Sequence, residues 1–315
     1  MARPTPEAHA HPAGGGSNAA LPSYALVTPA HDEETNLPRL ADSVLRQSVR
    51  PEAWVIVDDG SIDLTRDVAR TLADAHRWVR LVELPVREGA VRGGPIVRSF
   101  AAGERLVDPE VEVVVKIDAD VSLEPDYFER LLTAFADDQR LGIASGVAHE
   151  WEHGRWRPRF GTGTSVWGAV RAYRRACLVD VSPLIERMGW DTVDEHKARN
   201  GGWRTVTIHD LPFRHHRSEG DREPSSYSAW RTQGDLAYYL GYRPSYLAVR
   251  SIYHICKDVA AVGLPVGYVA SFLQRAERCT DPAVGRRVQD MQRLRSLRRR
   301  AGEKSGRRVR SREAD

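Results

Sequence analysis

Apolar and polar positions alternate along the first third of the chain in blocks that switch between strand and helix spacing. Short segments rich in apolar residues at 24–29, 53–57 and 79–84 predict three strands. Between them, the apolar residues of 37–45 and 65–75 recur at helical spacing, which predicts a helix in each segment. Strands that alternate with helices indicate a parallel sheet joined by right-handed crossovers. The sequence therefore predicts an α/β fold for its N-terminal part.

A fourth apolar run, 112–117, ends in two carboxylates that are one residue apart, Asp118 and Asp120. In open α/β sheets, ligands collect at the carboxyl ends of the strands. Neighbouring carboxylates repel each other, and a divalent cation relieves that repulsion. The Asp-x-Asp segment therefore predicts a cation site, with a solvated loop as the alternative for an isolated pair of this kind.

Two further polar segments follow strand tips. Asp58 and Asp59 open an Asp-Asp-Gly-Ser turn, where carboxylates can accept hydrogen bonds from a base or a ribose; an ordinary Asp-Gly turn is the alternative. The Gly-rich segment 87–98 opens a helix and suits a diphosphate, which makes Arg92 and Arg98 candidate diphosphate ligands. Its alternative is a flexible connection with solvated arginines.

The C-terminal third changes to a helical pattern. Residues 259–273 carry no charge, but Gly and Pro interrupt them and they are shorter than the roughly 20 residues of a membrane span. We expect either a buried helix or an interfacial one in peripheral contact with an anionic membrane. The elements predicted after the Asp-x-Asp segment are a helix at 125–136, a strand at 141–148, a surface excursion at 149–160, a helix opening at Gly189, a strand at 203–208 and helices across 226–274.

Charge is unevenly spread over the 315 residues. The net charge is +3, but 275–315 holds 14 Lys and Arg against 6 Asp and Glu. This basic tail has no interleaved aromatic residues, so we do not expect nucleic acid as a partner. Three widely spaced cysteines give neither a disulfide framework nor zinc spacing, which fits a reducing cytoplasm. Residues 1–22 lack the apolar core of a signal peptide and are expected to be disordered.

Five motifs in this order resemble the GT-A glycosyltransferases, specifically the large family 2. The resemblance covers 24–217, about three fifths of the chain. The motifs are Pro29-x-His31-x-Glu33, Asp58-Asp59-Gly60-Ser61, the Gly- and Arg-rich segment 87–98, Asp118-x-Asp120, and Trp190-Asp191 ahead of Gly202-Trp203.

The resemblance implies a site for a nucleotide-sugar donor. In this family the loop after the first strand and the second Asp of the Asp-Asp-Gly-Ser turn hold the nucleotide base. These roles carry over to Glu33 and Asp59, with Pro29 in the same loop and Asp58 in support. The family's usual Asn in the Gly-rich segment is missing here.

The resemblance also implies a metal. Asp120 would ligate Mn²⁺ or Mg²⁺ bridging the donor diphosphate, and Asp118 would be its ribose or water-mediated partner. The metal would neutralise the leaving nucleoside diphosphate. A further metal-facing His often follows the acidic segment in this fold, so His216 is expected as a ligand, with His215 as the alternative.

The catalytic base is expected in the acidic segment. The family usually has Glu-Asp there, but Trp190 replaces the Glu in this chain. Spacing from the later Gly-Trp pair favours Asp191 as the base, followed by Asp194 and then Glu195. One carboxylate must reach the acceptor hydroxyl. A helix N-cap is the alternative role for Asp191.

The predicted fold class is α/β: a GT-A (Rossmann-like) mixed, mostly parallel sheet flanked by helices, with a helical C-terminal extension. The predicted parts are a disordered tail at 1–22, the GT-A domain at 23–220, the extension at 221–300 and a basic disordered tail at 301–315.

The predicted function is metal-dependent, inverting transfer of a sugar from a nucleotide-diphosphate sugar to a glycan or lipid-linked acceptor. Cell-envelope or exopolysaccharide synthesis is the expected setting, in the cytoplasm or at the inner face of the cell membrane. A sugar-1-phosphate nucleotidyltransferase is an alternative, but it would need a basic Gly-rich loop where residues 30–33 are acidic. A non-catalytic GT-A-like binding module would be expected to lose the Asp-x-Asp motif, which is intact.

Overall fold

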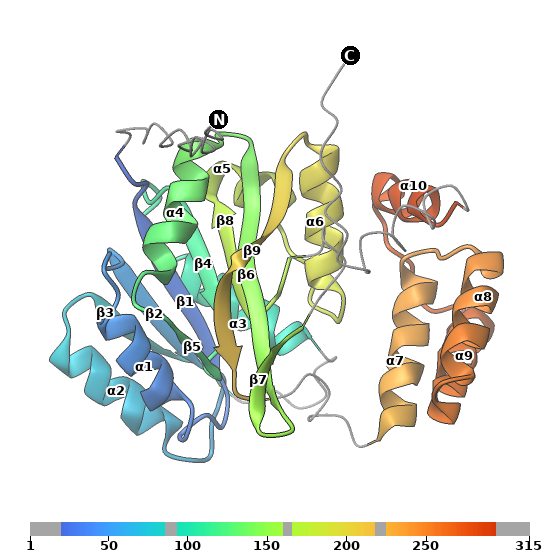
Figure 1. The fold of residues 1–315 in the computed structure, drawn as a ribbon, viewed down its shortest axis with the longest axis horizontal. Helices are drawn as coiled ribbons and strands as arrows, with labels where there is room; N and C mark the ends of the chain where they lie inside the picture. Colours follow the sequence, from blue (N-terminus) through green and yellow to red (C-terminus); the bar gives the residue numbers. More distant parts are fainter. Residues whose placement is uncertain (1–19, 86–92, 160–165, 218–224, 294–315) are drawn as a thin grey trace, which may run out of the picture.

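The computed structural model describes residues 20–85, 93–159, 166–217 and 225–293. A mixed sheet forms the centre of the N-terminal part, and a group of helices lies beside it (Figure 1). The strands are β1 (Tyr24–Ala30), β2 (Ala53–Asp58), β3 (Val79–Glu83), β4 (Val113–Ile117), β5 (Val121–Leu123), β6 (Leu141–Glu152), β7 (Arg155–Pro158), β8 (Val170–Arg174) and β9 (Arg204–His215). Their order is β3-β2-β1-β4-β8-β6-β9-β5, and β7 pairs with β6 outside this path.

The first half of the sheet is the predicted parallel part. β1 lies between β2 and β4 and is parallel to both, and β3 adds to β2 in the same direction. β1, β2 and β4 are buried along nearly their whole length, as strands of a parallel sheet covered on both faces should be, whereas the edge strand β3 is partly exposed. Their carboxyl ends therefore meet at one edge, which carries the predicted donor motifs.

The second half of the sheet differs from the prediction in two places. Residues 149–158 form a hairpin that the sequence did not predict: β6 runs on to Glu152 and pairs with β7, and most of this hairpin is exposed or half-buried at the surface. His153 and Gly154 both have positive φ angles, which suits the tight turn of such a hairpin. β9 extends to His215, well past the predicted end at 208, because it pairs with β6 across register shifts and then with β5.

Helices cover both faces of the sheet. Apolar side chains of α1, α2 and α4 pack into one core, and those of α3, α5 and α6 pack into another. This arrangement confirms the predicted α/β fold class. These helices are α1 (Leu37–Leu45), α2 (Thr65–Ala75), α3 (Gly94–Glu104), α4 (Tyr127–Asp137), α5 (Arg175–Val181) and α6 (Trp190–Asn200).

The C-terminal helices form a group beside the sheet (Figure 1). A small apolar cluster that includes Val193 of α6, Tyr239 and Val288 joins this group to the rest of the fold. Within the described residues, none of the helices is both long enough and apolar enough to cross a membrane. The group consists of α7 (Ser226–Tyr239), α8 (Pro244–Ile255), the 3₁₀ helix η1 (Val259–Val262), α9 (Gly263–Leu273) and α10 (Pro282–Met291).

Candidate active site

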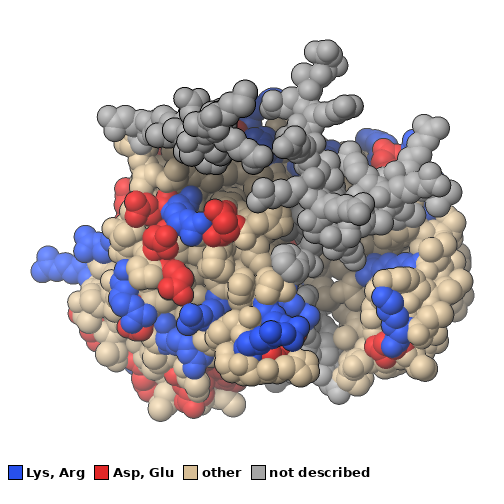
Figure 2. Space-filling view, in the orientation of Figure 1, with Lys and Arg blue, Asp and Glu red and all other residues tan. Residues whose placement is uncertain are grey.

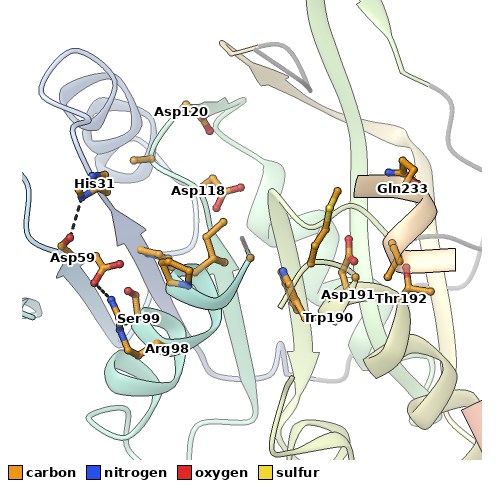
Figure 3. Close-up of a pocket in the computed structure, with 18 of the residues that line it drawn as sticks. His31, Asp59, Arg98, Ser99, Asp118, Asp120, Trp190, Asp191, Thr192 and Gln233 are labelled. Carbon is orange, nitrogen blue, oxygen red and sulfur yellow. Dashed lines mark hydrogen bonds and ion pairs between the residues drawn. The ribbon is translucent and has the colours of Figure 1, made fainter. Parts of the chain in front are cut away.

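A cavity of about 750 Å³ lies where the carboxyl ends of β1, β2 and β4 face the starts of α3 and α6. In Figure 3, Asp59 and Asp191 lie on opposite sides of this cavity, with Asp118 and Asp120 between them. The cavity thus brings together residues that are far apart in the sequence. The predicted site residues that line it are Pro29, Glu33, Asp59, Arg98, Asp118, Asp120 and Asp191.

Glu33, in the loop after β1, is held by a cation from the other end of the domain. Arg217 donates to both of its carboxylate oxygens at 2.9 Å, and Asn36 donates to it at 2.8 Å. Burial raises the pKa of Glu33, although the bonds from Asn36 and Arg217 oppose that shift. Glu33 therefore fixes Arg217 beside the cavity, a contact that the sequence did not indicate.

The two aspartates after β2 have different environments. Asp58 is fully buried and does not line the cavity; its carboxylate accepts from the Ser61 amide at 3.2 Å and from Arg66 at 3.2 Å. Asp59 faces the cavity and accepts from Arg98 Nη2 at 2.5 Å (Figure 3). Asp58 thus closes the turn, and Asp59 is the carboxylate that a ligand can reach.

Asp118 is paired with a buried lysine. Lys116 lies in β4, is almost fully buried, and donates to the Asp118 carboxylate and to the Gly168 carbonyl, the latter at 2.8 Å. The indole ring of Trp190 lies over the Lys116 ammonium at 5.6 Å. Lys116 is the one charged residue within β4, and the sequence did not indicate its partner.

Asp120 is 5% exposed at the cavity wall. His215 Nε2 lies 3.5 Å from its Oδ1 atom, and an Arg217 amino group lies 3.8 Å from Oδ2. Burial lowers the pKa of His215, but the hydrogen bond and charge of Asp120 outweigh this and raise it overall. His215, rather than His216, is therefore the histidine beside Asp120.

His216 points elsewhere. Its Nε2 atom is 2.8 Å from the Ser122 hydroxyl, and its ring meets the edge of Trp156. Burial, together with the nearby Arg39, lowers its pKa to about 4. The structure thus does not place His216 with the predicted metal ligands.

The residues present fit a metal that the donor helps to hold. Asp118 and Asp120 both face the cavity, and His215 lies next to Asp120. Within the described part of the chain, no cluster of three or more His, Cys, Asp or Glu residues is arranged to bind an ion unaided. Mg²⁺ and similar ions are commonly bound by one or two carboxylates that substrate phosphates complete. The remaining ligands would then come from the donor diphosphate and water.

Asp191 lies in the first turn of α6, across the cavity from Asp59 (Figure 3). It is half-buried, and its backbone carbonyl accepts from Arg171 at 2.8 Å. Within the described residues, no hydrogen bond or ion pair engages the side-chain carboxylate of Asp191. Asp191 therefore offers an open carboxylate to the cavity.

Asp194 and Glu195 lie one turn further along α6, are buried, and do not line the cavity. Asp194 is 1% exposed and accepts from Arg171 at 2.5 and 3.1 Å and from the Tyr173 hydroxyl. Glu195 accepts from the Val166 amide at 2.6 Å. Burial raises the pKa of Asp194 to about 6 and that of Glu195 to about 7, while Arg171 opposes both shifts.

The second wall of the cavity comes from the C-terminal helices, which sequence reasoning did not assign to the site. Leu236 of α7 and Arg250 of α8 both lie in segments that the sequence predicted only as helical. Arg92, predicted as a diphosphate ligand, lies outside the described residues. The side chains that these helices contribute are Gln233, Leu236, Leu240, Tyr242 and Arg250.

Comparison with known proteins gives a consistent result. The chain matches the family model for Glycosyl transferase family 2 over residues 25–180. It is 30% identical over 181 residues to an undecaprenyl-phosphate mannosyltransferase of Micrococcus luteus, which covers 52% of this chain and 72% of that protein. It is 28% identical over 141 residues to a validoxylamine A glucosyltransferase of Streptomyces hygroscopicus subsp. limoneus. That match covers 44% of this chain but spans only 29% of the relative's length.

Among solved structures, the chain is similar to a mannosyltransferase from Pyrobaculum calidifontis in complex with GDP-Man and Mn²⁺. The TM-score is 0.55 at 17% identity, over 90% of this chain and 85% of that one. A likeness at this identity establishes the fold, which is the predicted GT-A fold. Together with the family model and the Micrococcus relative, it shows that the chain belongs to glycosyl transferase family 2.

Proposed function

We propose that this protein transfers a sugar, with inversion, from a nucleoside-diphosphate sugar to an acceptor hydroxyl. The observation that carries the proposal is the cavity itself. One of its walls holds Asp59, Asp118 and Asp120 at the tips of β2 and β4, which flank β1, and the opposite wall holds Asp191. A donor bound along the first wall would present the far face of its sugar to the second.

The first wall suits a nucleoside diphosphate. Asp59 can accept hydrogen bonds from a base or ribose, and Arg98 is held beside it at 2.5 Å. Arg217, fixed by Glu33, brings a second cation to within 3.8 Å of Asp120. Arginine is well suited to phosphate oxygens because its planar fork donates two parallel bonds.

We propose Asp120 as the ligand of Mn²⁺ or Mg²⁺, with His215 in place of the expected His216 and with Asp118 in support. The Pyrobaculum structure contains Mn²⁺ with its donor, which supports this assignment. Such a metal would stabilise the charge that develops on the departing diphosphate. Lys116 and Arg217 already neutralise part of the negative charge of the two aspartates.

Asp191 is the proposed base. The acceptor hydroxyl would give its proton to the Asp191 carboxylate while its oxygen forms a bond to the anomeric carbon. The bond from that carbon to the diphosphate oxygen breaks at the same time, and the nucleoside diphosphate leaves with the electron pair. Attack from the side opposite the leaving group inverts the anomeric centre. Asp194 is not retained as an alternative, because Arg171 and Tyr173 occupy its carboxylate.

The acceptor would enter between Asp191 and the C-terminal helices. Leu236, Leu240 and Tyr242 make this side apolar, and Arg250 adds one cation. We propose a glycan or lipid-linked acceptor in cell-envelope or exopolysaccharide synthesis, in the cytoplasm or at the inner face of the cell membrane. The similarity to the Micrococcus undecaprenyl-phosphate mannosyltransferase supports the lipid-linked class.

Two measurements on the purified protein test this function. Calorimetric titration with a panel of nucleoside diphosphates and nucleotide sugars, with and without Mn²⁺, should find a donor whose binding needs the metal. Release of nucleoside diphosphate from that donor should then fall by about a hundredfold or more in Asp191→Asn, with donor affinity unchanged.

Asp210→Asn is the matched control, because Asp210 is an exposed acid paired with Arg130 away from the cavity. It should keep full turnover. Undiminished turnover in Asp191→Asn would show that the base is another group, and absence of binding by every nucleotide in the panel would refute the donor class.

A further inference from the structure

Exposed apolar side chains are concentrated on the C-terminal helices. Of the seventeen large apolar side chains that are exposed in the described residues, nine lie between Val249 and Leu273. Apolar side chains that are scattered singly over a surface are ordinary, but a contiguous cluster marks an interaction surface. We therefore infer that this region contacts either another macromolecule or a lipid surface.

One stripe of these side chains runs along η1 and α9. Its members are separated by three or four positions, so they lie on one side of the helical segment. Their exposed fractions range from 41 to 79%. We call this set the α9 stripe: Val259, Val262, Val266, Val269 and Leu273.

The opposite side of α9 is fixed against α7. A Cβ atom on Gly267 would lie 2.1 Å from the Arg231 carbonyl oxygen, so the two backbones approach closely there. Leu264 is fully buried, and the Ser271 hydroxyl donates to Asp235 of α7 at 2.9 Å. Because these contacts set the orientation of α9, the α9 stripe faces outward as a consequence of the fold.

The neighbouring helix α8 adds exposed apolar side chains, Val249, Ile252 and Tyr253. Exposed cations outnumber exposed anions around this segment: Lys257, Arg275 and Arg278 against Asp258 and Glu277. Asp258 is engaged as the cap of η1 and as the acceptor for the Trp230 indole, at 3.0 Å. In Figure 2 the surface over the C-terminal helices, on the right, shows fewer charged side chains than the sheet domain.

The sequence beyond α10 adds further positive charge. Residues 294–315 contain nine Lys and Arg against three Asp and Glu. An outward apolar stripe combined with an excess of cations is the composition of segments that lie in the interface of an anionic bilayer.

The geometry points to a docking face, formed by the α9 stripe and the exposed apolar side chains of α8, that inserts into the surface of a bilayer containing anionic lipid. A second copy of the chain is the less favoured occupant. It would bring another Lys257 and another Arg275 to the same interface, whereas anionic headgroups neutralise these cations. The inference deepens the proposed membrane location, and it does not depend on the transfer reaction.

Docking in this way would have a consequence for the site. Arg250 lies next to Val249 in α8, yet it lines the cavity on the acceptor side. The same helix therefore contributes to the docking face and to the acceptor wall. A membrane-bound protein would hold that wall near the lipid surface, where a lipid-linked acceptor is found.

Vesicle flotation of the full chain tests the docking face. The probes are vesicles of phosphatidylcholine alone and vesicles that also contain phosphatidylglycerol. The wild-type protein should float with the anionic vesicles and remain behind with the neutral ones. The triple variant Val259→Gln, Val269→Gln, Leu273→Gln should partition at least about tenfold more weakly, because each exposed side chain loses its favourable transfer from water.

A double variant with Ile62→Gln and Val179→Gln is the matched control. Both side chains are exposed apolar residues, 90% and 66% respectively, outside the C-terminal helices. This control should bind vesicles like the wild type. Wild-type protein that fails to float with anionic vesicles, or a triple variant that floats as well as the control, overturns the proposal. So does a wild-type dimer in light scattering that the triple variant abolishes without any vesicle binding.

A second measurement needs no change in the docking face. Cys256 is exposed at the end of α8, and Cys177 is fully buried. In a Cys279→Ser protein, an environment-sensitive dye on Cys256 should shift its emission to the blue when anionic vesicles are added. An unchanged spectrum at saturating lipid would contradict insertion. Neither measurement uses a sugar donor, so failure here leaves the proposed transfer activity to its own test.

Discussion

Arg171 offers a sharp test of the reasoning about buried charge. Its guanidinium has no exposed surface, although it carries a full positive charge. It donates to Asp194 at 2.5 and 3.1 Å, to the Val166 carbonyl at 2.7 Å and to the Asp191 carbonyl at 2.8 Å. It also lies 3.4 Å from Glu195. Arg171 thus connects β8 with the first two turns of α6.

Replacement of Arg171 with Met would preserve much of the side-chain volume while removing the charge and the donors. Asp194 and Glu195 would remain buried, each with fewer partners. Removal of one member of a buried ion pair destabilises a protein by about 3–5 kcal/mol. For a domain of about 200 residues this corresponds to a fall in Tm of about 6–20 °C. Urea unfolding followed by tryptophan fluorescence would measure the free energy of unfolding.

The loss should depend on pH with a defined sign. Burial raises the pKa of Asp194 to about 6 and that of Glu195 to about 7, and Arg171 limits both shifts. Without Arg171, both pKa values rise further in the folded protein and stay ordinary in the unfolded chain. The folded state then binds more protons than the unfolded state, so stability falls as the pH rises through the folded pKa values. The deficit of Arg171→Met should therefore be larger at about pH 8 than at about pH 5.

Arg204→Met is the matched control. Arg204 also pairs with an aspartate, Asp138 at 2.6 Å, but its side chain is 64% exposed. Exposed pairs contribute about 0–1 kcal/mol, so this variant should unfold close to the wild type. The reasoning about Arg171 is refuted if Arg171→Met unfolds within about 1 kcal/mol of the wild type at about pH 8. A deficit that is equal at both pH values would also refute it.

Three other predictions concern the metal and the C-terminal helices. Asp120→Ala should abolish the Mn²⁺-dependent part of donor binding in calorimetry; binding that still responds to the metal would exclude Asp120 as its ligand. His215→Gln should weaken the same signal by about tenfold or more, whereas His216→Gln should leave it nearly unchanged; the reverse order would restore the original expectation. Gly234→Ala should destabilise the protein by about 1–3 kcal/mol in thermal unfolding, because the new Cβ would lie 2.2 Å from a carbonyl oxygen of α9. Gly285→Ala, which meets nothing within 4 Å, is its control, and equal effects would argue against close packing of α7 and α9.

The sheet edge could be predicted from sequence because its information is local. β1, β2 and β3 were each recognisable as an apolar run, and the helices between them fixed the parallel direction. Asp59 follows β2 directly, and Asp118 and Asp120 follow β4, which is parallel to the same strands. Parallel strands place their carboxyl ends together, so chain order alone was enough to predict that these residues share a site.

The partners of those residues could not be predicted, because they depend on contacts between distant segments. Arg217 bonds to Glu33 across 184 positions, and Arg171 bonds to Asp194 across 23. Burial of Asp194 rather than Asp191 depends on which side of α6 faces the sheet, and a helix of low amphipathicity does not reveal that. The β6–β7 hairpin was missed because its polar, aromatic residues lack the alternation of a half-buried strand.

The contribution of α7 and α8 to the cavity was missed for the same reason. The helices across 226–274 were predicted, but a helical pattern does not identify the surface on which a helix packs. Only the fold shows that Leu236 and Arg250 reach the cavity wall. A domain boundary drawn in sequence near residue 220 therefore separates segments that share one site.

The replacement of the family's usual Glu by Trp190 can be understood from the charges around it. The Trp190 ring lies close to two buried cations, 5.6 Å from the Lys116 ammonium and 5.7 Å from the Arg171 guanidinium. A cation over an aromatic face is attracted to the ring without needing a carboxylate. Lys116 is thus free to pair with Asp118, and Arg171 pairs with Asp194. Both cations are engaged behind the cavity wall, which leaves Asp191 as the acidic residue in the first turn of α6 whose carboxylate faces the cavity.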